Sequence, residues 1–266
     1  MTSAKNPHRI DLFGCPLDAL TMEQAVNQIA VAIRQRRPVT HAALNTAKLI
    51  NMRQNPDLYI DVARSDLVTA DGMGIVLAAR LAGHRLAGRV TGIDLMDRVL
   101  ALCAQRGLRP FILGATQEVL DAAIYRIRLK YPGLCLAGSR HGYFSQSDED
   151  GIVQEINESR ADCLFVGLPT PKKERFIAAH RAKLSPSFVM GVGGSIDVLA
   201  GHVRRAPVWM QQRGLEWLYR TLQEPRRMWR RYLVTNIQFL CWLAAFIVFR
   251  AVGRTFAPLR EPLAAR

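Results

Sequence analysis

Short apolar runs alternate with longer segments of helical periodicity over the first three quarters of the chain. Six runs, most of them followed or interrupted by a glycine or a polar residue, are predicted strands: THAALN (40–45), SDLVTA (65–70), RPFILGA (109–115), LCLAGSR (134–140), ADCLFVGL (161–168) and PSFVMGVGG (186–194). The predicted helices are 46–55, 72–83, 117–130, 149–159 and 172–184. Strands that alternate with helices in this way indicate repeated βα units.

Two of these runs, CLFVG and FVMGV, are apolar at every position rather than at alternate positions. Strands of this kind are covered on both faces, as in a mostly parallel sheet with helices on each side. We therefore predict an α/β fold in which residues 1–201 form a Rossmann-like, mostly parallel sheet with helices on both faces. The carboxyl ends of the strands, where open α/β sheets bind ligands, carry Asn45, Asp71, Gly114, Gly167 and Gly193.

The composition changes after Gly201, and we predict that residues 202–266 form a separate helical appendage. Pro207 and Pro225 can each begin a helix, because proline suits the first helical turn and disrupts a helix interior. The appendage is rich in arginine and in large apolar residues, so we expect it to associate with a membrane.

Arginines and then uncharged residues make up the second helix of this appendage. Arg227, Arg230 and Arg231 have the spacing of one helical face, which suits a phosphate clamp or a lipid-facing stripe. Residues 232–249 carry no charge, but this run is interrupted by polar residues and is slightly shorter than the roughly 20 residues of a spanning helix. An interfacial or re-entrant helix is favoured over a transmembrane helix and over a helix buried in the core.

Basic residues exceed acidic ones by fourteen in the 266-residue chain, and most of the excess lies near its end. From residue 202 onward there are twelve arginines, no lysine and three glutamates, which give nine of these charges. Such a segment attracts the phosphates of a substrate, a nucleic acid or a lipid headgroup, unless it is a solvated face. Nucleic acid is disfavoured as a partner, because the arginines lead into aliphatic residues and no RNA-binding motif is present.

The cysteines and the first residues indicate a cytoplasmic environment. The chain has no CxxC pair, and its five cysteines lie in apolar runs, which is typical of reduced core thiols: Cys15, Cys103, Cys135, Cys163 and Cys241. The first 18 residues lack an apolar run of the length of a signal peptide, so no export is expected.

Single motifs leave the chemistry open. Asp71, in ADGMGIV (70–76), lies between a predicted strand and a predicted helix, where an acid can act as a general base or cap the helix. GVGGSID (191–197) can bring backbone amides close to a phosphate. It is not a dinucleotide fingerprint, because Ile196 stands where the third glycine or alanine belongs, and a nicotinamide-dependent oxidoreductase is therefore disfavoured.

Five stretches, taken together, resemble one known family: ADGMGIV, VTGIDLM (90–96), GLPTPKKERFI (167–177), GVGGSIDVLAG (191–201) and RRAPVWMQQRGLEWLYRTLQEPRRMWRRYL (204–233). They occur in unbroken order within about residues 10–235, and RAPVWMQQRGLEWLYR is the most specific. On these motifs the sequence resembles the WecG/TagA/CpsF-type glycosyltransferases of bacteria. Members of this family transfer N-acetylmannosamine in the synthesis of wall teichoic acid and enterobacterial common antigen, and relatives act in exopolysaccharide assembly.

The resemblance implies an inverting, metal-independent transfer from a UDP-sugar to a polyprenyl-diphosphate-linked saccharide in the synthesis of a cell-surface polysaccharide. On the family pattern Asp71 matches the proposed catalytic base. The positions implied to bind substrates are Asn45, Tyr143, Lys173, Gly193, Asp197, Arg220, Arg227 and Arg230. A leaving UDP gains negative charge, and clustered arginines are well suited to stabilise it where no metal does so.

The sequence departs from the family pattern at two places implied to lie near the sugar. Many relatives have Thr-x-Asn-x-Glu where this chain has Ala43, Asn45 and Ala47, and many have Pro-Lys-Gln-Glu where it has Lys173 in place of the glutamine. A hydroxyl, a carboxylate and an amide are thus lost. These losses leave two alternative donors open: a UDP-N-acetylmannosamine-type sugar, or a UDP-hexose such as UDP-glucose.

We expect no metal and no other cofactor. Asp148 and Asp150, in SDED (147–150), have the acid-x-acid spacing that some glycosyltransferases use for a metal, but a helix N-cap at Ser147 or Asp148 is favoured. The six histidines show no HxH or HExxH pattern, so a catalytic zinc site is not expected.

The lipid-linked acceptor also implies a location. Its isoprenoid tail stays in the bilayer, so the enzyme is expected to be a peripheral protein on the cytoplasmic face of the bacterial inner membrane. A homo-oligomer is compatible with the sequence. The alternative from another class is a non-catalytic basic protein that binds a membrane surface or a nucleic acid.

Overall fold

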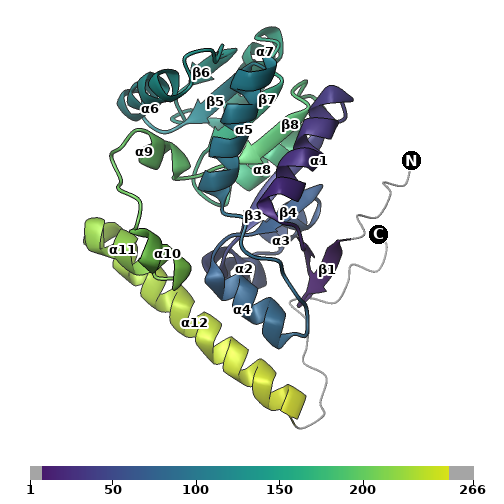
Figure 1. Ribbon diagram of the computed structural model, residues 1–266, viewed down its shortest axis with the longest axis vertical. Coiled ribbons are helices and arrows are strands. Elements are labelled where there is room, and N and C mark those ends of the chain that lie inside the picture. Colours follow the sequence, from purple (N-terminus) through teal and green to yellow (C-terminus); the bar gives the residue numbers. More distant parts are fainter. Residues whose placement is uncertain (1–7, 252–266) are drawn as a thin grey trace.

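A computed structural model gives the structure of residues 8–251, except for the side chains of Arg227, Arg231, Arg250 and Ala251. Its main sheet has six parallel strands in the order β4-β3-β8-β7-β5-β6 (Figure 1). These strands are β3 (Val39–Leu44), β4 (Leu67–Ala70), β5 (Pro110–Gly114), β6 (Gly138–Arg140), β7 (Cys163–Gly167) and β8 (Phe188–Gly191). A short antiparallel hairpin of β1 (Arg9–Leu12) and β2 (Cys15–Asp18) precedes them.

Helices pack against both faces of the main sheet. One face is covered by α1 (Met22–Arg34), α5 (Gly92–Arg106), α6 (Gln117–Lys130) and α9 (Ser195–Leu199). The other face is covered by α2 (Thr46–Gln54), α3 (Pro56–Ala63) and α4 (Met73–Leu81) at β3 and β4, and by α7 (Glu149–Glu158) and α8 (Lys172–His180) at β5, β7 and β8. The buried strands contribute side chains to the core on both faces of the sheet. This arrangement confirms the predicted α/β fold.

Two predicted elements are shorter in the structure. The run 134–140 forms a strand only over β6, because its first residues follow a turn in which the Leu134 amide bonds to Tyr131 O. The helix predicted over 172–184 ends at His180, whose carbonyl accepts bonds from Lys183 and Leu184 in the closing turn.

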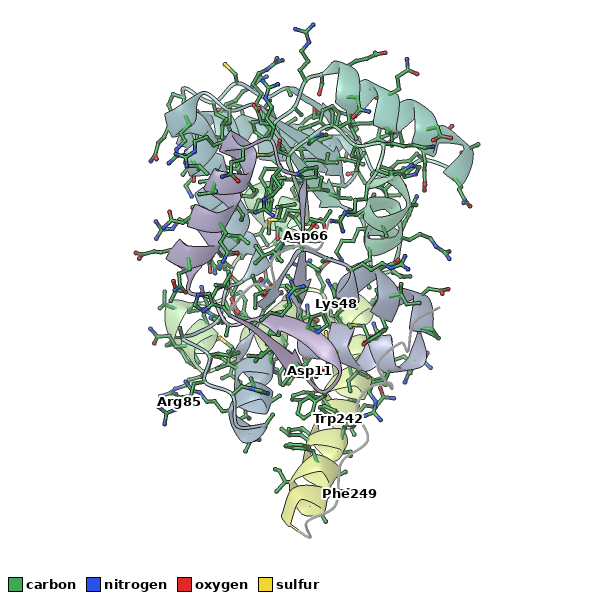
Figure 2. The ribbon with its side chains drawn as sticks, turned by 90° about the vertical axis from the view of Figure 1, so that its right-hand side faces the viewer. Asp11, Lys48, Asp66, Arg85, Trp242 and Phe249 are labelled. Carbon is green, nitrogen blue, oxygen red and sulfur yellow. The ribbon has the colours of Figure 1, made fainter. Side chains whose placement is uncertain are left out.

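Three helices follow the sheet toward the end of the described chain: α10 (Val208–Gln212), α11 (Glu216–Gln223) and α12 (Pro225–Ala251). The last is a helix of 27 residues that lies along the body and extends beyond it, with Phe249 far from the sheet (Figures 1 and 2). Its inner face is part of a core layer shared with α2, α4 and the hairpin, because Phe239, Trp242 and Leu243 are buried there.

An aromatic cluster fixes this contact. The ring of Phe13, in the hairpin turn, lies edge-on at 4.4 Å from Trp242 and at 4.8 Å from Phe246, measured between centroids. The guanidinium of Arg53, from α2, lies 5.3 Å from the centre of the Trp242 ring on which it packs. Such pairs add to the apolar burial of the helix, so the inner face of α12 belongs to the folded core.

The opposite face of α12 is apolar and exposed. We call it the outer stripe, and it consists of Trp229, Leu233, Ile237, Leu240, Ile247 and Val248. Intervals of three, four and seven residues place these side chains on one side of the helix. Within the described chain, one segment, Met228–Phe249, is long and apolar enough to cross a membrane by length and composition, and most of it is exposed.

Candidate functional site

A cleft of about 1,400 Å³ opens at the carboxyl ends of the parallel strands and continues between α4 and the C-terminal helices. The basic side chains that line it are Lys48, Arg80, Lys172, Lys173, Arg204, Arg205, Arg213 and Arg220. Its acidic lining residues are Asp71, Asp197 and Glu216. Because eight basic groups face three acidic ones, the cleft favours an anionic ligand such as a diphosphate.

Asp71 lies directly after β4, at the carboxyl edge of the sheet, and lines this cleft. Its amide donates to Leu44 O at 2.8 Å, which continues the ladder between β3 and β4. The helix that follows has Gly72 as its N-cap, with a φ of 102° that other residues rarely adopt. Asp71 therefore does not cap α4, and its carboxyl group remains available to the cleft.

The Asp71 carboxyl group is held by two donors in a buried environment. Burial raises its pKa, whereas hydrogen bonds from the Asn45 side chain and the Gly92 backbone amide, with the charge of Lys48, oppose that rise. Asn45 is also the N-cap of α2, because its Oδ1 accepts from the amide of Lys48 at 2.9 Å. Asn45 thus orients the carboxylate while its own position is fixed by a helix. A carboxyl group with a raised pKa and fixed donors suits a general base.

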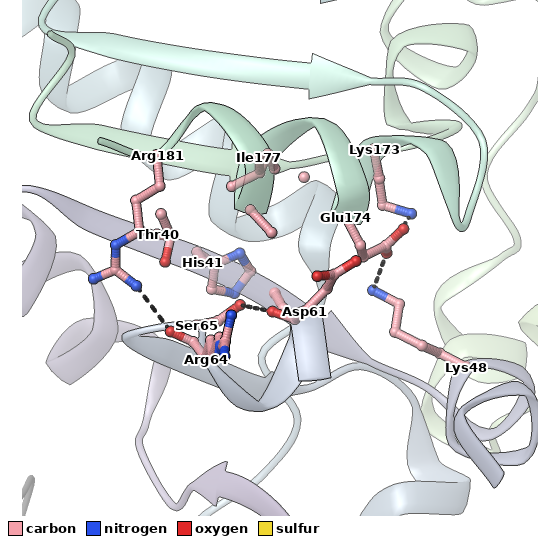
Figure 3. Close-up of a pocket in the computed structure, with 13 residues that line it drawn as sticks. Thr40, His41, Lys48, Asp61, Arg64, Ser65, Lys173, Glu174, Ile177 and Arg181 are labelled. Atoms are coloured by element: carbon pink, nitrogen blue, oxygen red, sulfur yellow. Dashed lines mark hydrogen bonds and ion pairs between the residues drawn. The ribbon is translucent and has the colours of Figure 1, made fainter. Parts of the chain in front are cut away.

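Lys48, Lys173 and Glu174 form a buried ion cluster beside this group (Figure 3). Both lysine Nζ atoms lie 2.9 Å from Glu174 Oε1, and Lys173 also donates to the Thr170 hydroxyl. Although burial opposes it, the two ammonium groups lower the pKa of Glu174 to about 2. The carboxylate therefore stays charged and holds both lysines at the wall of the cleft.

A second, smaller cavity of about 150 Å³ lies behind this cluster, between β3, α3 and α8 (Figure 3). It shares Lys48, Lys173 and Gly191 with the large cleft. His41 lies in it and bonds through Nε2 to the Thr69 hydroxyl at 2.9 Å, while burial and the charge of Lys48 lower its pKa to about 3. His41 is thus neutral and does not add to the charge of the site.

Three elements bring further predicted residues to the cleft: the loop after β8 carries Gly193, α9 carries Asp197 and α11 carries Arg220. A side chain at Gly194 would lie 3.5 Å from both Asp197 Oδ2 and an Arg220 terminal nitrogen, so these two groups flank the backbone there. Arg220 is held from α11 by Glu224, to which its Nε donates at 2.8 Å. Its terminal nitrogens consequently face the glycine loop, where backbone amides and a guanidinium suit a phosphate group.

The remaining predicted positions are less closely grouped. Tyr143 lines the far side of the cleft with 72% of its surface exposed, which leaves its ring free to pack on a ligand. Arg230 is exposed and is not among the residues that line the cleft. The Arg227 side chain lies outside the described residues.

The acidic run 148–150 has structural partners. The carboxylate of Asp148 accepts from the amide and the hydroxyl of Ser145, which caps the short 3-10 helix η1 (Gln146–Asp148) before α7. Asp150 pairs with Lys183 at 2.7 Å. Asp148 stands at the N-cap position of α7, as predicted, although its side chain makes no capping bond to that helix, and Ser145 is the N-cap of η1. Within residues 8–251, no group of three or more His, Cys, Asp and Glu side chains is arranged to hold a metal ion.

Several lining residues were not singled out from the sequence. Lys48 lies in a segment that reads as an ordinary helix, and only its distance from Glu174 reveals its place in the site. Arg204 and Arg213 were counted in the basic tail, but the sequence gives no sign that they line the cleft. Arg89 joins the tail to the body through an ion pair with Glu216. The place of each of these residues depends on contacts between distant parts of the chain, which local sequence does not show.

Comparison with known proteins places the chain among enzymes. The sequence model of the glycosyl transferase WecG/TagA/CpsF family matches residues 10–251. Three curated relatives from Staphylococcus aureus strains MW2, NCTC 8325 / PS 47 and COL are each 33% identical over 228 residues, which is 85% of this chain and 89% of theirs. All three are named N-acetylglucosaminyldiphosphoundecaprenol N-acetyl-beta-D-mannosaminyltransferase.

Proposed function

Because the chain belongs to the WecG/TagA/CpsF family of glycosyltransferases, we propose that it transfers a sugar from a UDP-sugar to a saccharide carried on a polyprenyl diphosphate, with inversion at the anomeric carbon. The curated relatives are named for the transfer of N-acetylmannosamine to N-acetylglucosaminyldiphosphoundecaprenol. We propose that this chain also uses a lipid-linked acceptor, and its donor is considered below. The product serves the synthesis of a cell-surface polysaccharide.

The environment of Asp71 carries this proposal. A base for this reaction must accept a proton from a sugar hydroxyl, and burial raises the pKa of Asp71 toward the range in which a carboxylate accepts protons readily. The donors from Asn45 and Gly92 hold it in one orientation at the edge of the large cleft. The acceptor hydroxyl gives its proton to Asp71 as its oxygen forms a bond to the anomeric carbon of the donor.

The bond between that carbon and the UDP oxygen breaks in the same step, and UDP leaves with an additional negative charge. Arg220 lies at the glycine loop and lines the cleft together with Arg204 and Arg213. No ion pair is formed by Arg204 or Arg213 within the described part of the chain, so their charges are available to the leaving diphosphate. We propose that these cations, rather than a metal ion, stabilise it.

For the donor, we propose a UDP-N-acetylmannosamine-type sugar or a UDP-hexose such as UDP-glucose. Ala43, Ala47 and Lys173, the three positions that depart from the family pattern, all line the cleft. Two of them offer a methyl group in place of polar groups, so fewer hydrogen bonds are available to an N-acetyl sugar. The loss of these hydrogen bonds supports a UDP-hexose as an alternative donor.

We propose that the protein is peripheral to the cytoplasmic face of the membrane, where its acceptor is found. The outer stripe of α12 exposes apolar side chains, while the inner face is bound to the core. A transmembrane position would require the aromatic cluster to separate, whereas an interfacial position leaves it intact.

One experiment tests this function. Membranes that contain polyprenyl-diphosphate-linked saccharides are incubated with the purified enzyme and a panel of labelled UDP-sugars, and the label in the lipid fraction is counted. We expect one sugar to enter this fraction, equally with EDTA and without it. If no UDP-sugar labels the lipid, the proposed transfer is wrong; if EDTA abolishes transfer and manganese restores it, the metal-free step is wrong.

A further inference from the structure

The large cleft extends past Asp71 between two helices. One face of α4 and one face of α12 line this part, which we call the α4–α12 arm. Its lining residues are Met73, Gly74, Val76, Leu77 and Arg80 from α4, and Met228, Tyr232, Asn236, Phe239 and Leu240 from α12. Most of these side chains are apolar, in contrast to the basic part of the cleft around Arg220.

The base of the arm is closely packed and its mouth is open. A side chain at Gly74 would lie 2.4 Å from Thr46 Cγ2 and 3.6 Å from the Phe239 ring, so the backbone of α4 lies directly on its neighbours there. Leu77 and Leu240, in contrast, are 49% and 61% exposed. Two leucines exposed on opposite walls of a groove leave apolar surface that an apolar ligand would cover.

Arg80 adds a charge at the end of the arm. It lies in the last turn of α4, and it is exposed. Its carbonyl accepts from the Gly83 amide, but its guanidinium takes part in no ion pair or hydrogen bond among the described residues. It lies nine positions after Asp71, and the helical part of this segment spans roughly 10 Å. An acceptor that places its hydroxyl at Asp71 can thus reach Arg80 with a negative group beyond its sugar.

The arm is also continuous with the surface that we assign to the membrane. Leu240 belongs both to the arm and to the outer stripe of α12. A chain that leaves the arm at Leu240 therefore meets the stripe and does not cross open water, which matters because each exposed CH2 group costs about 0.8 kcal/mol.

We propose that the α4–α12 arm binds the lipid end of the acceptor: Arg80 binds its diphosphate, and Leu77 and Leu240 pack against its first isoprenoid units. This inference rests on the proposed function, since it supplies the subsite for the acceptor of that transfer. Leu77 lies one helical turn before Arg80, and Leu240 follows Phe239, which packs beside Gly74. With the diphosphate at Arg80, the first isoprenoid units therefore turn back along the mouth of the arm.

Water-soluble acceptors test the arm without a membrane. N-acetylglucosaminyl diphosphate is prepared with either a methyl or a farnesyl group. Transfer from the UDP-sugar that labels the lipid fraction in the experiment above is measured without vesicles or detergent micelles. The wild-type KM should be at least about tenfold lower for the farnesyl acceptor, because several apolar groups are buried. Leu77→Ser and Leu240→Ser should raise the KM for the farnesyl acceptor and leave that for the methyl acceptor unchanged.

Matched variants control for general effects. Leu129, on α6, is 64% exposed and does not line the cleft, so Leu129→Ser should change neither KM. Arg80→Ala should raise the KM for both acceptors about tenfold or more with little change in kcat, and Arg80→Lys should restore part of the loss. Arg128→Ala, at another exposed arginine of α6, should have no effect.

The outcomes separate the two proposals. Equal wild-type KM values for both acceptors, or unchanged values in the leucine variants, would overturn the arm as a lipid subsite while transfer itself still supports the proposed function. An unchanged KM in Arg80→Ala would remove Arg80 from the diphosphate site. Absence of transfer to either acceptor with every UDP-sugar would overturn both. Binding of farnesyl diphosphate alone, followed by calorimetry, should weaken in the same variants and provides a readout independent of turnover.

Discussion

At the scale of single residues, the position that we propose for Asp71 carries a cost to stability. Its raised pKa shows that the folded protein disfavours the charged form relative to water. Asp71→Asn should therefore leave the free energy of unfolding unchanged or slightly increased, while turnover falls by about two to four orders of magnitude. Denaturant unfolding and initial rates on the same preparation check this. A variant that turns over within a few-fold of the wild type would exclude Asp71 as the base.

The hydrogen bond from Asn45 gives a second, pH-dependent prediction. A base acts in its ionised form, so kcat/KM should fall as the pH drops through the Asp71 pKa, above the usual value of about 3.9. Asn45→Ser removes the amide that stabilises the carboxylate but keeps an oxygen suited to the N-cap of α2. The acid limb of the pH profile should then move to higher pH, with little change in stability. A limb that stays in place or moves to lower pH would contradict the assigned contact.

Glu174 is predicted to act mainly on stability. Glu174→Gln leaves two buried ammonium groups without their carboxylate and should lower the free energy of unfolding by roughly 3 kcal/mol at pH 7. Since the folded pKa is depressed to about 2, this contribution is present above the unfolded value near 4.5 and is lost as the pH falls toward 2. Urea unfolding of both proteins at pH 7 and pH 3.5 should show the difference shrinking. An equal difference at both pH values would refute the ion cluster as its source.

The sequence predicted some of these residues better than others. Asp71 and Gly193 follow apolar strands, and the position of strand ends is readable from a run of buried residues. Lys48 and Arg80 lie within helices, where a basic residue usually faces solvent, so only packing between distant elements shows their place. Arg230 fits the family pattern, but its orientation depends on how α12 packs, which local spacing does not determine.

At the scale of elements, strands of the main sheet were predictable because they are buried on both faces and end at glycine or polar residues. The β1–β2 hairpin was not predicted, since strands of four residues give little periodicity. Helix α12 shows a further limit: the sequence of its uncharged run does not tell which side packs on the body, yet one face is core and the other is exposed. The division is set by the aromatic contacts with Phe13 and Arg53, which are distant in sequence.

Substitutions on the two faces of α12 should therefore have different effects on stability and on membrane binding. Trp242→Ala removes a buried ring from the aromatic cluster and should lower the free energy of unfolding by about 3–5 kcal/mol. Ile237→Ser, on the outer stripe, should change stability by less than about 0.5 kcal/mol but weaken binding to lipid vesicles. Denaturant unfolding and vesicle flotation measure the two effects. If Ile237→Ser destabilised the protein as much as Trp242→Ala, the outer stripe would be part of a buried interface.

At the scale of the whole molecule, the proposed function assigns charge and apolar surface to two different partners, a diphosphate and a membrane surface. The large cleft gathers basic groups for a diphosphate, and the outer stripe lies on a helix that begins among arginines. Under the proposed function, the basic groups of the cleft bind a diphosphate and the arginines of α12 lie near a membrane surface, so the net charge of +14 does not by itself indicate a nucleic-acid partner.

Binding of the full chain to vesicles should show both contributions. Anionic vesicles should bind it more tightly than neutral ones, because arginines near a negative surface each contribute about 1 kcal/mol. Raising the salt from about 0.1 M to 1 M shortens the Debye length from about 10 Å to 3 Å, which removes the arginine contribution but leaves the apolar burial of the outer stripe. High salt should therefore weaken flotation without abolishing it, and Ile237→Ser should weaken it further in high salt. A carbonate wash distinguishes the remaining alternative, since a transmembrane helix would stay in the pellet whereas an interfacial helix would be released. Protein that binds neutral vesicles as tightly as anionic ones and resists both treatments would contradict a peripheral position, and the core contacts of Trp242 would then have to break on insertion.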